Sequence, residues 1–151
     1  ALSMTNYDMN ILDEFIECHG GDSLMIAKWL RFNSLILNEN IIETIKKIYY
    51  NEKHFNKITP NHVYTLIYAF RLNPYFHQIR DGKAIGYEFF ADVINDLDSL
   101  NPSVSSYIAS AFEIKDKLSD EHQQLMKNIV DKLLANDKLS ANSREILENI
   151  K

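Results

Sequence analysis

Residues 119–134 read SDEHQQLMKNIVDKLL and carry the clearest helical pattern in the chain. Ser119 is a residue type that caps helix N-termini, and Asp120 and Glu121 suit the positive end of a helix dipole. Apolar residues then recur at intervals of three and four, which places them on one face of a helix. They are Leu125, Met126, Ile129, Val130, Leu133 and Leu134. This stretch therefore predicts an amphipathic helix packed against a core.

The same spacing recurs upstream and downstream, and it predicts eight helices in all. Gly20-Gly21 is expected to end the first helix, over residues 7–18, in a left-handed turn. The predicted N-caps of later helices are Asp22 or Ser23, Thr59 before Pro60, Asn101 before Pro102, and Ser140. The fifth helix is expected to present an apolar face that runs from Tyr87 to Leu100. No stretch alternates as a strand would, and residues 80–85 are expected to form an exposed loop.

Helices joined by short connectors favour antiparallel neighbours. We therefore expect an all-α fold in which stacked antiparallel helix pairs form a curved superhelical solenoid, each pair burying its face on the next. A compact helical bundle is the alternative. The length of 151 residues suits a single helical domain over residues 1–151.

Composition excludes several function classes. The formal net charge of −5 argues against binding to nucleic acid or to an anionic membrane surface, both of which need clustered Lys and Arg. No apolar run is long enough to cross a bilayer. The single cysteine, Cys18, has no partner for an internal disulfide and is expected to be buried and inert. These features favour a reducing compartment, and we expect a cytoplasmic protein.

Catalytic motifs are missing from the sequence. A zinc peptidase would need H-E-x-x-H, and no His-Glu dipeptide occurs. His54 and His62 are eight residues apart, a poor spacing for metal ligands, and we interpret them as solvated or capping side chains. Asp92 and Asp96 lie one helical turn apart, which is more typical of a solvated helix face than of acid–base chemistry. Arg144 and Glu148 have the spacing of a helical ion pair. We expect no catalytic residue, no metal ligand and no cofactor site in this chain.

A set of short motifs runs in order along most of the chain, although no single motif is specific. They are Lys28-Trp29, His54-Phe55, Pro60-Asn61 and Ala69-Phe70, Phe76-His77, Asp81-Gly82, Gly86-Tyr87, Phe89-Phe90-Ala91-Asp92, the stretch from Leu97 to Pro102, Leu139-Ser140 and Glu145-Ile146. The ordered set resembles the zinc aminopeptidases of the aminopeptidase N (alanyl aminopeptidase) type, and the resemblance covers nearly the whole sequence. Residues 83–85 are extra relative to the family pattern and are interpreted as a surface-loop insertion.

The resemblance implies that this chain is the later part of a non-catalytic, helical C-terminal domain. Such a domain encloses the catalytic chamber of an enzyme that removes N-terminal residues from peptides, so its partners are the catalytic domain of the same chain and the peptide substrate. The zinc and its ligands would lie upstream. Some family members line the chamber just after the Asn-Pro motif with a Gln and, one turn later, an Arg. Ser103 and Tyr107 stand at these positions and become the candidate chamber-lining residues, while Tyr107 is alternatively packed with Val104 and Ile108.

A free-standing helical-repeat module that binds other proteins is the second hypothesis. It would share the fold without belonging to an enzyme. The length of the natural reading frame separates the two, because the resemblance implies a long upstream region that contains H-E-x-x-H.

Overall fold

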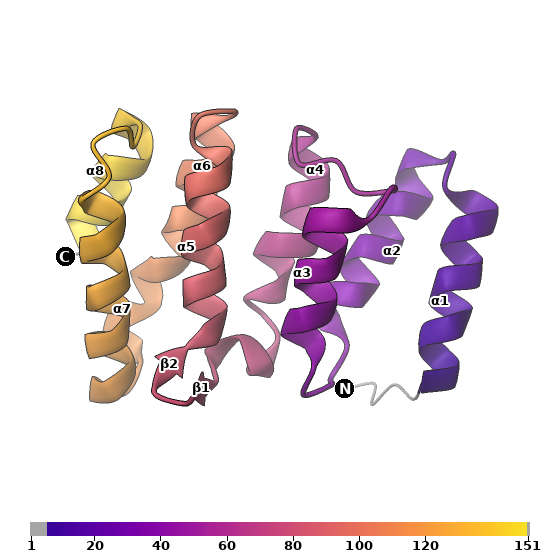
Figure 1. Ribbon diagram of the computed structural model, residues 1–151, viewed down its shortest axis with the longest axis horizontal. Helices are drawn as coiled ribbons and strands as arrows, with labels where there is room; N and C mark the ends of the chain where they lie inside the picture. The colour runs from indigo at the N-terminus through magenta and orange to yellow at the C-terminus, as the bar shows by residue number, and fades with distance from the viewer. Residues whose placement is uncertain (1–5, 151) are drawn as a thin grey trace. The chain divides into compact units, whose positions relative to one another are not determined.

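The structure is a computed structural model that describes the backbone of residues 6–150 and the side chains of residues 11–150. Consecutive α-helices run in opposite directions within each half of the chain, which confirms the predicted all-α fold of antiparallel helix pairs (Figure 1). The α-helices are α1 (Asn6–His19), α2 (Ser23–Leu35), α3 (Ile41–Asn51), α4 (Pro60–Val63), α5 (Ile85–Leu97), α6 (Pro102–Ala109), α7 (Asp120–Leu134) and α8 (Ala141–Ile150). A π-helical turn (Tyr64–Tyr68) continues α4, and 3₁₀ segments cover Pro74–His77 and Ser110–Lys117.

The chain divides into two compact units, Ala1–Phe76 and His77–Lys151. The prediction of one domain over residues 1–151 stays a prediction. In unit 1, α2 packs against α1, α3, α4 and the π-helical turn. The large side chains at its centre are fully buried. They include Trp29, Leu30, Ile41, Ile45, Leu66, Ile67, Phe70 and Phe76.

Asn73 joins the end of α2 to the loop that follows the π-helical turn. Its side chain is buried, and Nδ2 donates to the carbonyls of Ser34 (3.1 Å) and Ile36 (2.8 Å). Its Oδ1 accepts from the backbone N–H of Tyr75 at 3.1 Å. A buried amide is tolerated there because its donor and acceptor groups are both paired.

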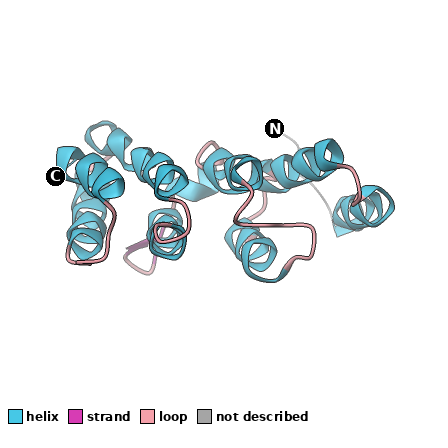
Figure 2. Ribbon diagram, turned by 90° about the horizontal axis from the view of Figure 1, so that it is seen from above, coloured by secondary structure: helices cyan, strands magenta, loops and turns pink. Residues whose placement is uncertain are grey.

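In unit 2, α5 packs against both α6 and α7, and α6 packs against α8 (Figure 2). The core contains Tyr87, Phe89, Phe90 and Phe112, each at most 1% exposed. The apolar stripe of α7 is confirmed at its centre, where Met126, Ile129, Val130 and Leu133 are buried. Leu100 was expected on the buried face of α5, but it follows the helix and is exposed.

The predicted helix starts are confirmed, with one difference in how they are capped. Asp22, rather than Ser23, caps α2 by accepting from the N–H groups of Leu24 (2.8 Å) and Met25 (3.2 Å). Asn101, Ser119 and Ser140 accept from the N–H groups two or three residues into α6, α7 and α8, respectively. Thr59 precedes α4 as predicted, but its side chain makes no capping hydrogen bond. Pro60 at the first position still fixes the helical backbone angle there.

The expected loop at residues 80–85 is wrong, because these residues form a small hairpin and the start of α5. Strands β1 (Ile79–Arg80) and β2 (Lys83–Ala84) pair antiparallel through a two-residue turn. Both turn residues have positive φ, 50° at Asp81 and 71° at Gly82. This geometry is typical of a type I′ turn, for which Asp-Gly is a favoured sequence. Residues 83–85 are therefore not a plain surface insertion, and Ala84 is only 1% exposed.

Gly20-Gly21 ends α1, but not through the expected left-handed turn, since neither glycine has a positive φ. Gly20 is needed for space: a Cβ there would collide with the His54 ring and lie 2.9 Å from the Ile16 carbonyl oxygen. A Cβ added at Gly21 would have no atom within 4 Å.

Cys18, expected to be buried, is exposed. Over the described residues, no helix has the length and apolar character needed to span a membrane.

Candidate functional site on α6

Helix α6 presents an exposed face that carries both sequence-predicted site residues. Ser103 and Tyr107 lie four residues apart, so they share one side of the helix. Ser103 is exposed, and Tyr107 is 45% exposed. The opposite side contains Val104 and Ile108, which are buried. The alternative in which Tyr107 packs with Val104 and Ile108 is therefore wrong, and the tyrosine faces outward.

Two further serines extend this face, and the sequence pattern did not identify them. The Ser106 hydroxyl donates to the Ser103 carbonyl at 3.0 Å, and the Ser110 hydroxyl donates to the Tyr107 carbonyl at 2.7 Å. Spacings of three and seven from Ser103 could have suggested them, but apolar periodicity ignores polar positions. We call Ser103, Ser106, Tyr107 and Ser110 the α6 hydroxyl face.

The α6 hydroxyl face belongs to an uncharged stretch. From Ser99 to Phe112 no residue carries a charge, although 25% of the chain is Asp, Glu, Lys or Arg. Within residues 77–150, Leu100 and Tyr107 are the large apolar side chains that remain exposed. The chemistry available on this face is therefore neutral hydrogen bonding together with contact against an aromatic ring.

A buried polar cluster holds α6 against α5 and α8. Asp98, only 5% exposed, follows α5. It accepts from the Ser140 N–H (2.5 Å), the Ser140 hydroxyl (2.8 Å) and the Ser143 hydroxyl (2.5 Å) at the start of α8. Ser105 of α6 lies 3.2 Å from the Ser143 hydroxyl oxygen and donates to the Ile94 carbonyl at 3.2 Å. We call Asp98, Ser105, Ser140 and Ser143 the Asp98 cluster.

The electrostatics of the Asp98 cluster favour a charged carboxylate. Burial raises the pKa of Asp98, but hydrogen bonds from Ser143 and Ser140 lower it and prevail. The carboxylate therefore stays ionised and stabilises the junction of the three helices. This cluster is structural: it fixes the position of the helix that carries the hydroxyl face.

His77 of the Phe-His motif and Tyr87 of the Gly-Tyr motif meet in unit 2. His77 Nδ1 lies 2.9 Å from the Tyr87 hydroxyl, and burial raises the pKa of Tyr87. His122 Nε2 donates to the His77 carbonyl at 2.6 Å, which leaves Nδ1 of His122 to accept from the Ser119 hydroxyl at 2.8 Å. These contacts link the start of unit 2 to α5 and α7, so the motif residues serve packing.

The remaining histidine candidates also have local partners. His62 Nδ1 accepts from the N–H of Asn56, in the connector that precedes α4, at 3.0 Å. His54 lies under Gly20, with Nε2 at 4.0 Å from Glu17, whose carboxylate pairs with Lys53 at 2.8 Å. Among residues 6–150, no three His, Cys, Asp or Glu side chains come close enough to hold a metal ion.

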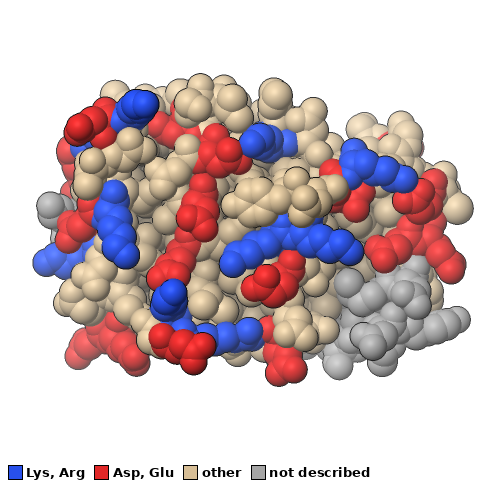
Figure 3. All heavy atoms as spheres, viewed as in Figure 1, with Lys and Arg blue, Asp and Glu red and all other residues tan. Residues whose placement is uncertain are grey.

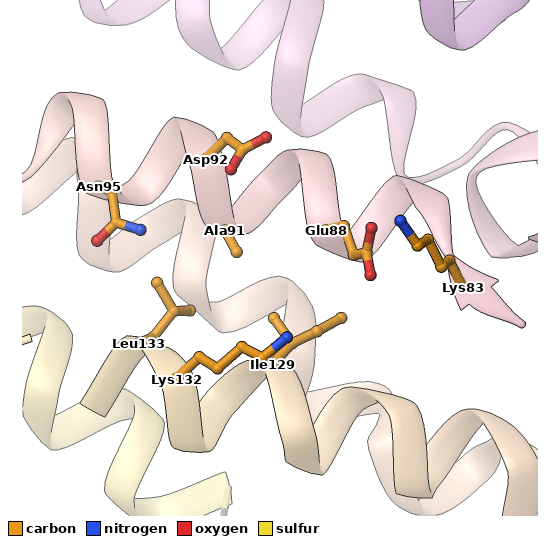
Figure 4. A pocket seen from close by; sticks show the side chains of 8 residues that line it. All are labelled: Lys83, Glu88, Ala91, Asp92, Asn95, Ile129, Lys132 and Leu133. Atoms are coloured by element: carbon orange, nitrogen blue, oxygen red, sulfur yellow. The ribbon is translucent and has the colours of Figure 1, made fainter. Parts of the chain in front are cut away.

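The carboxylates on α5 do not converge into an acid–base pair. Acidic side chains run down the molecular face over α5 (Figure 3). Asp92 is exposed, as expected for a solvated helix face, and Asp96 is half-buried. Asp92 and Glu88 border a hollow of about 380 Å³ between α5 and α7, with Lys83 and Lys132 also on its rim (Figure 4). The rim charges balance, and Figure 4 shows Asp92 and Glu88 pointing in different directions.

Comparison with known protein families shows which family the chain belongs to. A family model described as "Domain of unknown function (DUF3458_C) ARM repeats" matches residues 2–151. The chain belongs to this family. Armadillo-type repeats stack helix pairs into superhelices, so the predicted solenoid class is confirmed over the bundle alternative.

Proteins similar to this chain include aminopeptidases. The chain is 25% identical over 136 residues to aminopeptidase N of Escherichia coli, covering 89% of this chain and 15% of that protein. It is 25% identical over 138 residues to aminopeptidase N of Haemophilus influenzae, covering 91% and 16%. A crystal structure of Legionella pneumophila aminopeptidase A in complex with aspartic acid matches with a TM-score of 0.84 and 27% identity, over 92% of this chain and 16% of that one.

These matches agree with the resemblance read from the sequence motifs and support a relationship between this chain and the C-terminal domain of the aminopeptidases. The chain spans about one sixth of the length of these relatives.

Proposed function

We propose that this chain is the non-catalytic C-terminal domain of a zinc aminopeptidase that removes N-terminal residues from peptides. The domain encloses the catalytic chamber and shapes the access of substrate. It acts together with the catalytic domain of the same parent chain, which holds the zinc. The parent enzyme works in the cytoplasm, where an exposed thiol such as Cys18 stays reduced.

One observation carries the role in substrate access: the α6 hydroxyl face is exposed at the positions that the family resemblance assigns to the chamber lining. Tyr107 is turned outward with 45% of its surface exposed. The Asp98 cluster meanwhile fixes α6 against α5 and α8. A rigid helix that presents hydroxyl groups and an aromatic ring suits contact with a peptide.

The test compares long peptide substrates with a short aminoacyl-amide in the full-length parent enzyme. Replacing both Ser103 and Tyr107 by Ala should raise the KM for peptides of four to six residues by roughly threefold to tenfold, since one or two hydrogen bonds are lost. The KM for an aminoacyl-amide, which contacts only the catalytic centre, should not change. Asn142→Ala, at an exposed position on α8, is the matched control. Equal effects on both substrates, or none on either, would contradict the chamber-lining role.

A further inference from the structure

We propose that the exposed side of α2 is a docking surface for an acidic amphipathic helix, supplied by the part of the parent chain that lies outside residues 1–151. The inference rests on the proposed function, in which this chain is one domain of a longer enzyme. It names a surface of unit 1 and the chemistry of the segment that covers it.

An apolar stripe runs along the exposed side of α2. Leu24, Phe32 and Leu35 are 58%, 55% and 38% exposed. With 3.6 residues per turn they fall within about 80° of one another around the helix axis, so they share one side. Leu30 and Asn33, which are buried in unit 1, lie on the opposite side. In α7, by contrast, every exposed residue is polar.

Leu72 extends the stripe at the C-terminal end of α2. The side chain of its neighbour Asn73 donates to the carbonyls of Ser34 and Ile36, which fixes this loop beside the end of the helix. Leu72 is exposed there. We call Leu24, Phe32, Leu35 and Leu72 the α2 apolar face. Large apolar side chains that gather on one exposed side mark a surface that binds a partner.

The charges on the same side of α2 give the sign of the partner. The other exposed residues between Leu24 and Leu35 are Lys28 and Arg31. No Asp or Glu occurs from residue 23 to residue 38, although the net charge of the chain is −5. Among the side chains that the structure describes, no carboxylate forms an ion pair with Lys28 or Arg31. Carboxylates that flank the apolar residues of a partner would complement both cations.

Shape and charge together select one occupant. A second helix can lay apolar residues spaced three and four apart along such a stripe. A second copy of this chain, docked symmetrically through α2, would place Lys28 and Arg31 opposite the same two cations, which is repulsive. The chain spans about one sixth of the length of its relatives, so a parent of that length offers many segments that could dock. A helix of the same chain also docks intramolecularly, at a high effective concentration.

Thiol labelling in the full-length parent tests the inference. Phe32→Cys places a thiol on the α2 apolar face, and Asn142→Cys places one at an exposed position of α8 as the matched control. Both are made together with Cys18→Ser, because Cys18 is itself exposed. Maleimide labelling of each position is followed by mass spectrometry in the parent and in this chain alone. We expect residue 32 to react at least about tenfold more slowly in the parent, and residue 142 to change by less than about threefold.

Charge variants of the same parent test the acidic character of the partner. Lys28→Glu with Arg31→Glu should speed the labelling of residue 32 by about fivefold or more, because like charges then face each other. Lys28→Gln with Arg31→Gln removes the charge without reversing it and should have a smaller effect. A labelling rate that the charge reversal leaves unchanged would contradict an acidic partner.

Three further results would overturn the inference. They are equal labelling of residue 32 in the parent and in the chain alone, equal protection of residues 32 and 142 in the parent, and protection that grows with parent concentration, which would identify a second copy as the occupant. The aminopeptidase activity of the same parent separates this inference from the proposed function. An active parent with an accessible residue 32 contradicts only the docking surface, whereas an inactive parent with a protected residue 32 contradicts only the proposed function.

Discussion

The Ser143 hydroxyl donates to the Asp98 carboxylate across 2.5 Å and so joins the end of α5 to the first turn of α8. Ser140 adds two more hydrogen bonds to the same carboxylate, and Ser105 of α6 contacts Ser143. Three helices of unit 2 thus meet at one buried charge. The position of α6, and with it the hydroxyl face, depends on this contact.

Asp98→Asn should destabilise the protein by about 2–4 kcal/mol, because the new amide brings a donor toward groups that already donate and the buried hydroxyls lose an acceptor. Urea unfolding followed by circular dichroism measures the change in free energy. Asp116→Asn, at an exposed position, serves as the control and should change it by less than about 0.5 kcal/mol. An equal, small effect of both substitutions would show that the Asp98 cluster does not stabilise the fold.

Acid should remove the stabilisation that Asp98 provides. Its pKa is lower in the folded protein than the value of about 3.9 expected in the unfolded chain. The contribution is therefore complete above about pH 5, where the carboxyl is ionised in both the folded and the unfolded chain, and is lost as the pH falls through the folded-state pKa. Urea unfolding of wild type and Asp98→Asn at a series of pH values should give curves that converge below pH 4. A difference in stability that stays constant down to pH 2 would contradict this account.

Gly20→Ala and Gly21→Ala form a matched pair at the end of α1. A methyl group at Gly20 would meet the His54 ring and the Ile16 carbonyl oxygen, whereas one at Gly21 meets nothing within 4 Å. Gly20→Ala should cost about 1–3 kcal/mol in unfolding free energy through overpacking. Gly21→Ala should be neutral or slightly stabilising, since alanine restricts the unfolded chain. Thermal unfolding of the two variants measures these changes. A larger loss of stability in Gly21→Ala than in Gly20→Ala would show that the turn requires glycine, rather than the contact of residue 20 with the His54 ring.

Arg144 should stabilise the protein through α7 and not through an ion pair with Glu148. The guanidinium donates to the Leu134 carbonyl at 3.0 Å and to the Asn136 carbonyl at 2.9 Å, where α7 ends. Arg144→Ala should cost about 1–2 kcal/mol, because those carbonyls lose their donors. Glu148→Gln should change the unfolding free energy by less than about 0.5 kcal/mol. Denaturant unfolding measures both variants. If Arg144→Ala and Glu148→Gln lost similar amounts of unfolding free energy, the Arg144–Glu148 ion pair expected from the sequence spacing would explain the role of Arg144 better.

The fold was predictable wherever a helix is long and its end has a local signal. The stripe of α7, the Asn101-Pro102 start of α6 and the Ser140 cap depend on residues within one or two turns of each other, so periodicity and capping rules suffice. The hairpin escaped prediction because two-residue strands are too short to show alternation. Its turn carried a usable signal in Asp81-Gly82, which is equivalent to the Asn-Gly pair that is the commoner hairpin marker.

The candidate site was predictable only in part. The resemblance pointed to Ser103 and Tyr107, but it did not show that Tyr107 faces outward or that Ser106 and Ser110 complete the face. The Asp98 cluster was hidden because its members lie up to 45 residues apart in the chain, and no local pattern links them. The expected burial of Cys18 was wrong because helical spacing beside Phe15 and Ile16 does not decide which side of α1 a residue occupies.

The most direct test of the central claim is the turnover of an aminoacyl-amide substrate by the full-length parent enzyme and by this chain alone. The account predicts chelator-sensitive hydrolysis by the parent and no hydrolysis above background by the pure chain. Chelator-sensitive turnover by the pure chain, or a parent without aminopeptidase activity, would contradict it.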